Sequence, residues 1–327
     1  MQFIARRLGF YVIAAWVAVT VNFFIPRAMP GNAVDTMMAK FPNLTAQAQK
    51  ALEAEFGVGH EGSLPHQYWV YLGDLAHLNL GTSVSLYPAK VSSVLANTIP
   101  WTLALVGTAT VISFALGTLL GILAAWRRDG WLDRSLPAFT FLQATPYFFL
   151  ALLAIELLAD TWHVFPFGGG FKLGLVPSWN LTFIGSAVYH SILPALTIVA
   201  TSMAGWMLQM RNVMITTIGE DYVLAAQAKG LSPRRVILTY AARNAILPNI
   251  AGFALAIGFV VAGALVMEIV FSYPGVGLTL FNAVTSNDYP LTQGIFLVIS
   301  FAVLAACLLA DVVYVFADPR ARTRQAY

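Results

Sequence analysis

Residues 220–249, EDYVLAAQAKGLSPRRVILTYAARNAILPN, predict a helix, a tight turn and a second helix. Glu220 and Asp221 place negative charge at the start of the first helix, and Lys229 places positive charge at its end, as the helix dipole favours. Gly230 comes next, and glycine readily adopts the left-handed conformation that closes a helix. We therefore expect the first helix to end at Gly230.

The second helix of this stretch has an equally clear beginning. Ser232 suits the cap position, and Pro233 suits the first helical position, where no backbone donor is needed. Pro248 is expected to kink this helix as it enters apolar sequence. A structured polar element between two long apolar runs indicates either a docking surface or an ordinary connecting loop, and the local chemistry leaves both interpretations open.

The composition is that of a membrane protein. Of 327 residues, 58% are hydrophobic and only 10% are charged, and the mean hydropathy is +0.73. A soluble domain carries about 25% charged residues. The net charge of +3 does not indicate nucleic-acid binding, because the basic residues follow a membrane topology. The single cysteine, Cys307, permits no internal disulfide.

The hydropathy pattern predicts an all-α polytopic protein with six transmembrane helices, since a helix needs about 20 apolar residues to cross a bilayer. The expected spans are Leu8 to about Ala28, Trp101–Trp126, Leu136 to about Ala159, Ile192–Met210, Ile246 to about Val270, and about Gly294 to Phe316. We therefore divide the chain into an N-terminal transmembrane helix at 1–28, an extracytoplasmic loop domain at 29–100, and a five-helix core at 101–327.

The basic residues set the orientation of these spans. With the N-terminus inside, 13 of the 18 lysines and arginines fall on the inner side, and the positive-inside rule then places both termini in the cytoplasm. These inner residues are Arg6, Arg7, Arg127, Arg128, Arg134, Arg211, Lys229, Arg234, Arg235, Arg243, Arg320, Arg322 and Arg324. The stretch 220–249 then lies on the cytoplasmic face, between spans four and five.

The outer segments carry weaker signals. A helix is expected from Thr45 to about Phe56, and an amphipathic piece with aromatic residues suited to a membrane interface at Gln67–Leu78. Asp160–Tyr189 contains a triple glycine without the lysine of a phosphate loop, so it predicts a turn-rich re-entrant or capping loop. The third outer segment, Phe271–Gln293, contains the turn signal SYPGVG.

Three acids fall in or near the expected spans, namely Glu156, Glu268 and Asp311. An ionisable group inside a membrane indicates function by default. Glu156 and Glu268 lie near outer ends, where solvation is an alternative to a pathway role. Glu268 is accordingly a candidate for either a pathway acid or a structural acid.

Small residues at Ala254, Gly258 and Ala262 recur at a spacing of four in span five. This spacing lets helices approach closely in lipid, and it suits either a pore-lining layer or packing within the chain. The chain lacks HExxH, G-x-S-x-G and Walker A motifs. We therefore expect no catalytic site, no metal site and no ATP site of its own.

The stretch DYVLAAQAKGLSPRRVILTYAARNAILP resembles the cytoplasmic loop of binding-protein-dependent ABC importer permeases, and in particular the dipeptide/oligopeptide/nickel branch. Leu224 stands where the general importer loop has glutamate, and the interval from Gly230 to Pro248 is longer than in that loop. Both departures are typical of the peptide branch. Four further stretches are similar to family segments: ARRLGFYVIAAWVAVTVNFFIPRAMPGN, LNLGTSVSLYPAKVSSVLANTIPWTLALV, HSILPALTI, and VMEIVFSYPGVG, which aligns Glu268 with the family's acid.

The resemblance implies a type I ABC importer permease fold in the prokaryotic inner membrane. It implies a homologous second permease, two cytoplasmic ATPases that bind ATP and magnesium, an external solute-binding protein, contact with lipid and no nucleic acid. The chain itself is then not an enzyme and binds no cofactor. The loop at 220–249 becomes the coupling helix, with ATPase-coupling residues Asp221, Tyr222, Ala225, Ala226, Lys229, Gly230, Ser232, Arg234 and Arg235.

The substrate stays open at the level of sequence. Small peptides are the leading expectation, β-linked oligosaccharides are the alternative within the family, and nickel ranks below both. An ion-coupled secondary transporter would show internal repeats and paired charges in the membrane, and the sequence shows neither. An intramembrane enzyme would need a polar catalytic cluster, which the motifs do not supply.

Overall fold

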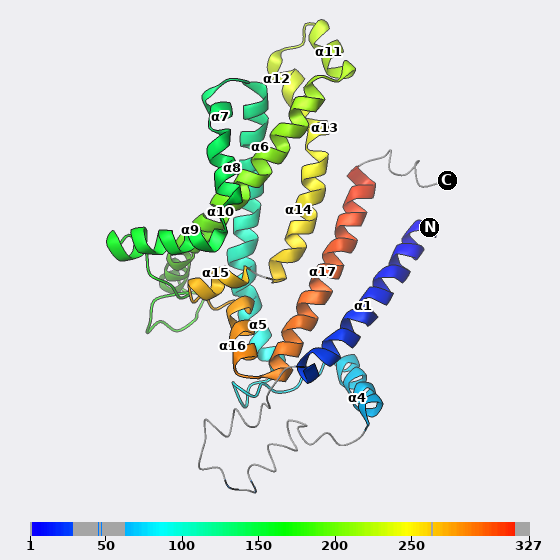
Figure 1. Cartoon of the computed structure of the whole chain (residues 1–327), viewed down its shortest axis with the longest axis vertical. Coiled ribbons are helices and arrows are strands. Elements are labelled where there is room, and N and C mark those ends of the chain that lie inside the picture. Colours follow the sequence, from blue (N-terminus) through cyan, green and yellow to red (C-terminus); the bar gives the residue numbers. More distant parts are fainter. Residues whose placement is uncertain (1, 29–44, 46, 48–62, 263, 318–327) are drawn as a thin grey trace. The chain divides into compact units, whose positions relative to one another are not determined.

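The computed structural model describes residues 2–28, 45, 47, 63–262 and 264–317. Within these residues the regular structure is helical, apart from an isolated antiparallel bridge between Thr82 and Lys90 (Figure 1). The helices are α1 (Gln2–Ala28), α4 (Leu64–Ala76), α5 (Val91–Thr102), η1 (Leu103–Gly107), α6 (Thr108–Trp126), α7 (Trp131–Arg134), α8 (Leu136–Ala144), α9 (Tyr147–Ala154), η2 (Ile155–Thr161), α10 (Leu181–Ile218), α11 (Asp221–Ala228), α12 (Pro233–Arg235), η3 (Val236–Ala242), α13 (Arg243–Ala245), α14 (Leu247–Phe259), η4 (Val260–Ala262), α15 (Leu265–Val270), α16 (Val276–Thr285) and α17 (Tyr289–Ala317).

The chain divides into two compact units. The first unit comprises residues 1–102, 261–269 and 274–305, and the second comprises 103–260, 270–273 and 306–327. The helix expected from Thr45 to Phe56 and the inner arginines Arg320, Arg322 and Arg324 lie largely or wholly outside the described residues.

The first unit is built on an apolar core shared by α5, α16 and the start of α17. Val91 and Leu95 of α5 pack with Leu280 of α16 and Ile295 of α17. Gly294 makes this contact possible, because a Cβ at that position would lie 2.4 Å from Cγ1 of Val91.

In the same unit, α4 packs its tyrosines onto α1. The ring centroid of Phe23 lies 5.1 Å from that of Tyr68 and 5.6 Å from that of Tyr71, and the Thr20 and Tyr68 hydroxyls are 2.7 Å apart. Trp69 on the same helix is 70% exposed. The amphipathic piece predicted at Gln67–Leu78 is therefore a helix, but two of its aromatic residues serve packing within the chain rather than an interface.

The second unit is organised by the close pairing of α6 with α10. A Cβ added to Gly117 would lie 2.6 Å from the Met203 carbonyl oxygen, and one added to Gly121 would lie 2.6 Å from the Met207 carbonyl oxygen. Two glycines four residues apart thus allow backbone-to-backbone contact, as in small-residue helix packing in membranes. This pair was not predicted from the sequence.

The small-residue face predicted on span five also makes a close contact. A Cβ at Gly258 would lie 1.8 Å from Cβ of Ala306 on α17, within the second unit. Of the two interpretations given above, packing within the chain is the one that the described residues display.

Three helices are long and apolar enough to cross a membrane, namely Val91–Trp126, Leu181–Ile218 and Tyr289–Val312. Two bent pairs, Leu136–Ala144 with Tyr147–Thr161 and Pro233–Ala245 with Leu247–Ala262, bring the count to five if each pair is one span. The expected spans two and four lie within longer helices, which begin at Val91 and Leu181. Hydropathy detects only the apolar part of a helix, whereas backbone hydrogen bonding continues beyond it.

Spans three and five were predicted as single helices, and both are broken. The third bends by 98° between Ala144 and Tyr147, because Pro146 lacks an amide donor and keeps Thr145 extended, at ψ 126°. The fifth ends near residue 262, and α15 is a separate helix. Glu268 therefore does not lie on the helix of the fifth span.

Candidate functional site

The stretch at 220–249 forms the expected helical hairpin. Helix α11 ends at Ala228, Lys229 occupies the cap, and Gly230 has φ of +73°. Ser232 is extended and immediately precedes the short helix α12. The expected cap position is confirmed, but the Ser232 side chain makes no capping hydrogen bond.

One side of the hairpin is buried against two long helices. Val223 and Ala226 of α11 share a core with Met210 and Met214 of α10 and with Ala125 of α6. Residues of η3 and α13 complete that core, namely Val236, Ala241, Ala242 and Ala245. Because all of these side chains are at most 7% exposed, displacement of the hairpin would have to move α10 and α6 or open this core.

The other side of the hairpin is exposed. Of the nine predicted coupling residues, eight lie on this side, namely Asp221, Tyr222, Ala225, Lys229, Gly230, Ser232, Arg234 and Arg235. Ala226 is the exception, because it is 2% exposed and belongs to the core. The Ala226 side chain therefore packs inside the hairpin and not on its exposed side.

Two apolar side chains on the exposed side were missed as contact candidates. Leu224 is 48% exposed and Leu238 is 63% exposed, and the ring of Tyr222 is 41% exposed. Large apolar residues at exposed positions of a polar segment indicate an interaction surface. Knowing that Val223 and Ala226 face inward is what identifies Leu224 as outward-facing.

The hairpin is connected to α14 through a bend of 50° at Ile246–Leu247. Pro248 lies in the first turn of α14, so the predicted kink is confirmed. Asn249 follows it and is completely buried, with its side-chain N–H 3.5 Å from the Trp206 carbonyl oxygen of α10. The hairpin is thus contiguous with the end of one apolar helix and the start of another.

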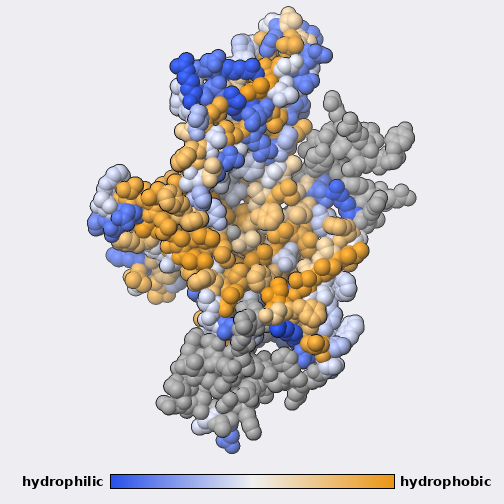
Figure 2. All heavy atoms as spheres, viewed as in Figure 1, coloured by the Kyte–Doolittle hydropathy of each residue, from blue (hydrophilic) through white to orange (hydrophobic). Residues whose placement is uncertain are grey.

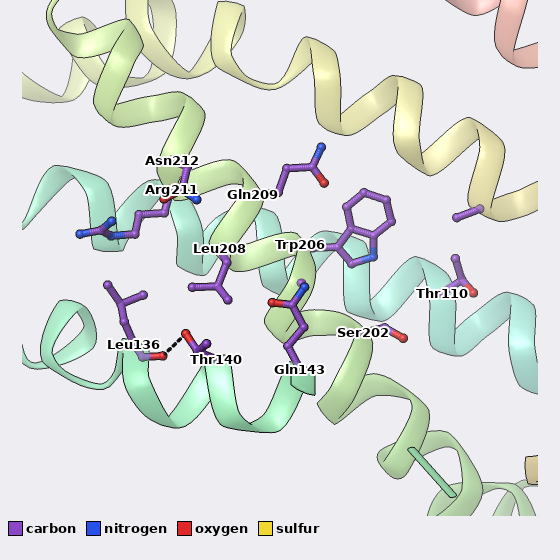
Figure 3. A pocket seen from close by; sticks show the side chains of 12 residues that line it. Thr110, Leu136, Thr140, Gln143, Ser202, Trp206, Leu208, Gln209, Arg211 and Asn212 are labelled. Carbon is purple, nitrogen blue, oxygen red and sulfur yellow. Dashed lines mark hydrogen bonds between the residues drawn. The ribbon is translucent and has the colours of Figure 1, made fainter. Parts of the chain in front are cut away.

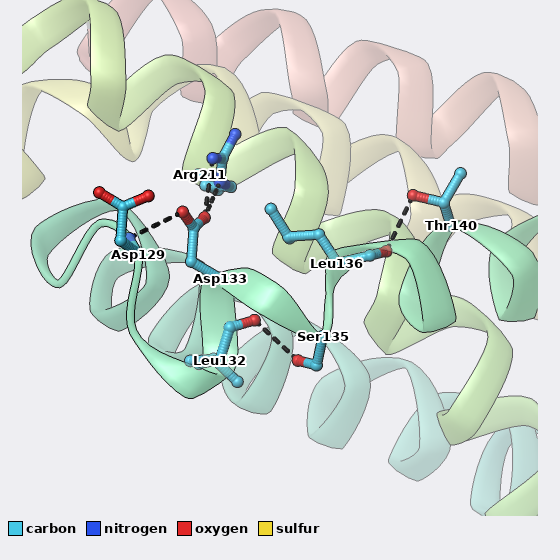
Figure 4. Close-up of polar contacts among 7 residues, drawn as sticks. All are labelled: Asp129, Leu132, Asp133, Ser135, Leu136, Thr140 and Arg211. Atoms are coloured by element: carbon cyan, nitrogen blue, oxygen red, sulfur yellow. Dashed lines mark hydrogen bonds and ion pairs between the residues drawn. The ribbon is translucent and has the colours of Figure 1, made fainter.

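An ion pair joins α10 to α7 in the second unit (Figure 4). The Arg211 guanidinium donates to Oδ1 of Asp133 from Nε at 2.8 Å and from a terminal nitrogen at 2.7 Å. Oδ2 accepts from the Asp129 backbone N–H at 3.1 Å. Burial acts to raise the pKa of the Asp133 carboxyl, but these hydrogen bonds and the charges of Arg211 and Arg128 outweigh it, so the pKa lies below its ordinary value.

Beside this ion pair lies a cavity of about 850 Å³ (Figure 3). It is lined by residues of α6, α8, α10 and α14, namely Thr110, Leu136, Thr140, Gln143, Ser202, Gly205, Trp206, Leu208, Gln209, Arg211, Asn212 and Ala256. This site was not predicted from the sequence. Polar residues at positions 202, 209 and 212 of an apolar helix, and at 140 and 143 of another, were the available signal.

Glu268 lies in the first unit and is completely buried. Its Oε2 accepts from the backbone N–H groups of Gly277 at 2.6 Å and Leu278 at 3.3 Å, and its Oε1 accepts from the Thr102 hydroxyl at 2.7 Å. The Thr102 hydroxyl oxygen accepts in turn from Val276 N–H at 2.8 Å.

These bonds satisfy the first three amide donors of α16, and the negative charge suits the positive end of that helix. Glycine is required beside the carboxylate, because a Cβ at Gly275 would lie 2.4 Å from it. The alternative that solvent satisfies Glu268 is wrong. Its contacts are those of a structural acid.

On the face seen in Figure 2, hydrophilic residues gather over α7, α11 and α12, whereas hydrophobic residues cover α9. The exposed residues Leu152, Leu153 and Phe149 belong to that hydrophobic surface. Within the second unit, the hairpin end therefore has the polarity of a solvated surface. Among the described residues, no group of three His, Cys, Asp or Glu side chains could hold a metal ion.

Comparison with known proteins supplies independent information. The family model described as "Binding-protein-dependent transport system inner membrane component" matches residues 117–323. The di/tripeptide transport system permease protein DppB of Pseudomonas aeruginosa (strain UCBPP-PA14) is 32% identical over 336 residues, covering 98% of this chain and 99% of that protein.

Two further relatives agree with it. The dipeptide transport system permease protein DppB of Escherichia coli (strain K12) is 32% identical over 345 residues, covering 99% of this chain and all of the relative. The oligopeptide transport system permease protein AppB of Bacillus subtilis (strain 168) is 29% identical over 302 residues, covering 92% of each chain.

Proposed function

Because the chain belongs to the family of binding-protein-dependent transport system inner membrane components, we propose that it is the permease subunit of an ATP-driven importer of di- or oligopeptides. The names of its relatives, which describe dipeptide, di/tripeptide and oligopeptide permeases over nearly the whole chain, carry this proposal. A binding-protein-dependent system implies an ATPase and an external solute-binding protein, and the chain resides in the inner membrane.

We further propose the architecture of the working complex. The chain crosses the membrane six times with both termini in the cytoplasm, using α1 as the first span and the two bent pairs as the third and fifth. Residues 29–100 form an extracytoplasmic loop domain in front of a five-helix core at 101–327. A homologous permease and two ATPase subunits complete the assembly, and those ATPases bind ATP and magnesium.

The exposed side of the hairpin at 220–249 is proposed to seat on an ATPase. Tyr222, Leu224 and Leu238 supply apolar contact, and Arg234 and Arg235 supply charge at its rim. The buried side couples that contact to α10 and α6 through the core around Met210 and Met214. Closure of the ATPases would then bias a two-state rearrangement of these helices.

Reconstitution tests this function directly. Proteoliposomes holding the complete complex should take up labelled trialanine only when ATP is inside with the ATPases and the loaded binding protein is outside, and the binding protein should stimulate ATP hydrolysis. Uptake driven by a proton gradient without ATP would overturn the proposal. Uptake of a β-linked disaccharide in place of peptide would overturn the substrate class alone.

A further inference from the structure

We propose that the cavity between α8 and α10 is a binding site for the main chain of the translocated peptide, read by four uncharged side chains: Gln143, Ser202, Gln209 and Asn212 (Figure 3). This inference rests on the proposed function, because it takes the transported solute to be a peptide. The volume of the cavity, about 850 Å³, falls within the usual range for small-molecule sites, about 300–1,000 Å³.

The four side chains are distinguished by being free to bind. Within the described part of the chain, none of them makes a hydrogen bond to another group. The two threonines that share the lining differ, since Thr140 donates to the Leu136 carbonyl and Thr110 donates to the Val106 carbonyl. Gln143, Gln209 and Asn212 are exposed and Ser202 is half-buried, so the cavity presents donors and acceptors that a solute can reach.

The charged side chain that lines the cavity is paired with another residue of the protein. Among the described residues that line it, Arg211 alone is ionisable, and its guanidinium is bonded to Asp133 at 2.7 Å and 2.8 Å. The remaining lining is neutral. Such a surface has little preference between acidic and basic side chains of a solute, so it suits recognition of the part that all peptides share.

Carboxamides match that shared part chemically. Each peptide unit offers one N–H donor and one C=O acceptor, and a glutamine or asparagine side chain offers both complementary groups. Gln143 approaches from α8, where a Cβ at Gly205 would lie 3.4 Å from its Nε2, while Gln209 comes from α10. Figure 3 shows Gln143 on α8, and Gln209 and Trp206 on α10.

The spacing along α10 fits an extended chain. Ser202 and Gln209 are seven residues apart, which is two helical turns, and Asn212 follows within a further turn. At about 1.5 Å per residue, the three groups span about 15 Å, the length of about four residues of extended peptide.

One wall of the site is held rigidly. The Trp206 ring packs edge-to-face against Phe114 at 5.4 Å between centroids, and a Cβ at Gly252 would lie 3.3 Å from its six-membered ring. An aromatic side chain that is already held by packing adds little ordering cost to binding.

The test compares a peptide with an analogue that lacks main-chain donors. Complexes are reconstituted with one unchanged binding protein, and uptake of labelled trialanine is compared with uptake of its depsipeptide, in which ester oxygens replace the amide N–H groups. Gln143→Leu and Gln209→Leu are each expected to lower kcat/KM for trialanine by about three- to tenfold, the worth of one hydrogen bond. The depsipeptide should lose less, so the preference for amide over ester falls.

Two neighbouring hydroxyls on α10 give a matched control. Ser202→Ala removes a free hydroxyl in the cavity and should reduce the amide preference. Thr201→Val removes a hydroxyl already bonded to the Thr197 and Ile198 carbonyls and should leave that preference unchanged. If the leucine variants fail to assemble, the Ser202→Ala and Thr201→Val pair decides the question.

Equal losses for both probes in the cavity variants would overturn the proposal, since they would indicate only a hydrated passage. An unchanged amide preference would overturn it equally. In both cases a wild-type complex that imports trialanine with ATP leaves the proposed function standing. A wild-type complex that imports the disaccharide instead would remove the proposed substrate and this inference together.

Discussion

Gly230 forms the turn of the hairpin, and its backbone angle restricts which residue types can replace it. Its φ of +73° lies in the left-handed region, and a Cβ at this position would meet no atom within 4 Å. A larger residue would therefore meet no steric clash at its Cβ, and the positive φ is what decides which residues are tolerated. The conformation costs an ordinary residue about 1–2 kcal/mol, with asparagine tolerated best.

We predict that Gly230→Val impairs the coupling of ATP hydrolysis to uptake while Gly230→Asn retains most of it. Both variants add a Cβ into open space, but a β-branched residue cannot easily hold a positive φ. Peptide uptake and binding-protein-stimulated ATP hydrolysis measure the effect in proteoliposomes. Wild-type coupling in the valine variant would show that the turn is not needed for transmission.

Glu268 shows how an acid in an apolar chain can be structural. It and Thr102 occupy the amide donors at the start of α16. We predict that Glu268→Gln lowers the stability of the permease by about 1.5–3 kcal/mol, because the neutral side chain loses the charge that strengthens its bonds and keeps one acceptor oxygen for donors on both sides. The midpoint of thermal unfolding in detergent measures this loss.

Glu156→Gln is the matched control for that variant. Glu156 is a second acid in an apolar stretch, and it is exposed. Its replacement should leave the unfolding midpoint unchanged. A Glu268→Gln variant of normal stability that has lost peptide uptake would instead assign Glu268 to the translocation pathway.

At the scale of elements, the pairing of α6 with α10 supports both the hairpin and the cavity. Met210 belongs to the hairpin core, and the neighbouring residues of α10 line the cavity. The close approach of the two helices depends on Gly117 and Gly121, because backbone atoms of α10 lie where a Cβ would be. Movement of α10 therefore links the two sites.

We predict that Gly121→Ala destabilises the second unit by about 1–3 kcal/mol, as overpacking of a tight contact does. An added Cβ would lie 2.6 Å from the Met207 carbonyl oxygen and 2.7 Å from Cβ of Met210. Gly185→Ala on α10, where a Cβ meets nothing within 4 Å, is the control and should leave stability unchanged or raise it by up to about 1 kcal/mol, because alanine is the better helix former. The yield of folded permease and its unfolding midpoint measure both variants; equal values would contradict this account of the packing.

At the scale of the whole molecule, the proposed topology makes a prediction that chemical labelling can check. Trp131 is 79% exposed and Trp179 is 99% exposed, and the proposed orientation places them on opposite sides of the membrane. In a Cys307→Ser background, Trp179→Cys should react with a membrane-impermeant maleimide in intact cells. Trp131→Cys should react only after the inner membrane is permeabilised. The reverse labelling pattern would show that the orientation is opposite to the proposed one.

The sequence alone predicted the parts of the hairpin that depend on local backbone preference. Glycine after Lys229 and proline after Ser232 specify where helices end and begin, since φ limits act on one residue at a time. The same reasoning predicted the bend at Pro248, and the family followed from motifs along the whole chain. The hydropathy pattern underestimated the lengths of the helices. Apolar residues indicate the part of a helix that lies in the membrane, whereas backbone hydrogen bonding continues beyond that part.

Other features depended on side chains distant in sequence, which no local preference encodes. The burial of Ala226, the neutralisation of Arg211 by Asp133, and the three donors on Glu268 each need partners on other helices. The neutral cavity likewise exists only where α8 and α10 face each other. The sequence thus predicted a peptide-type permease with a capped helical hairpin. Only the tertiary structure decided which residues are free to bind, because hydrogen-bond satisfaction and burial are properties of packed helices.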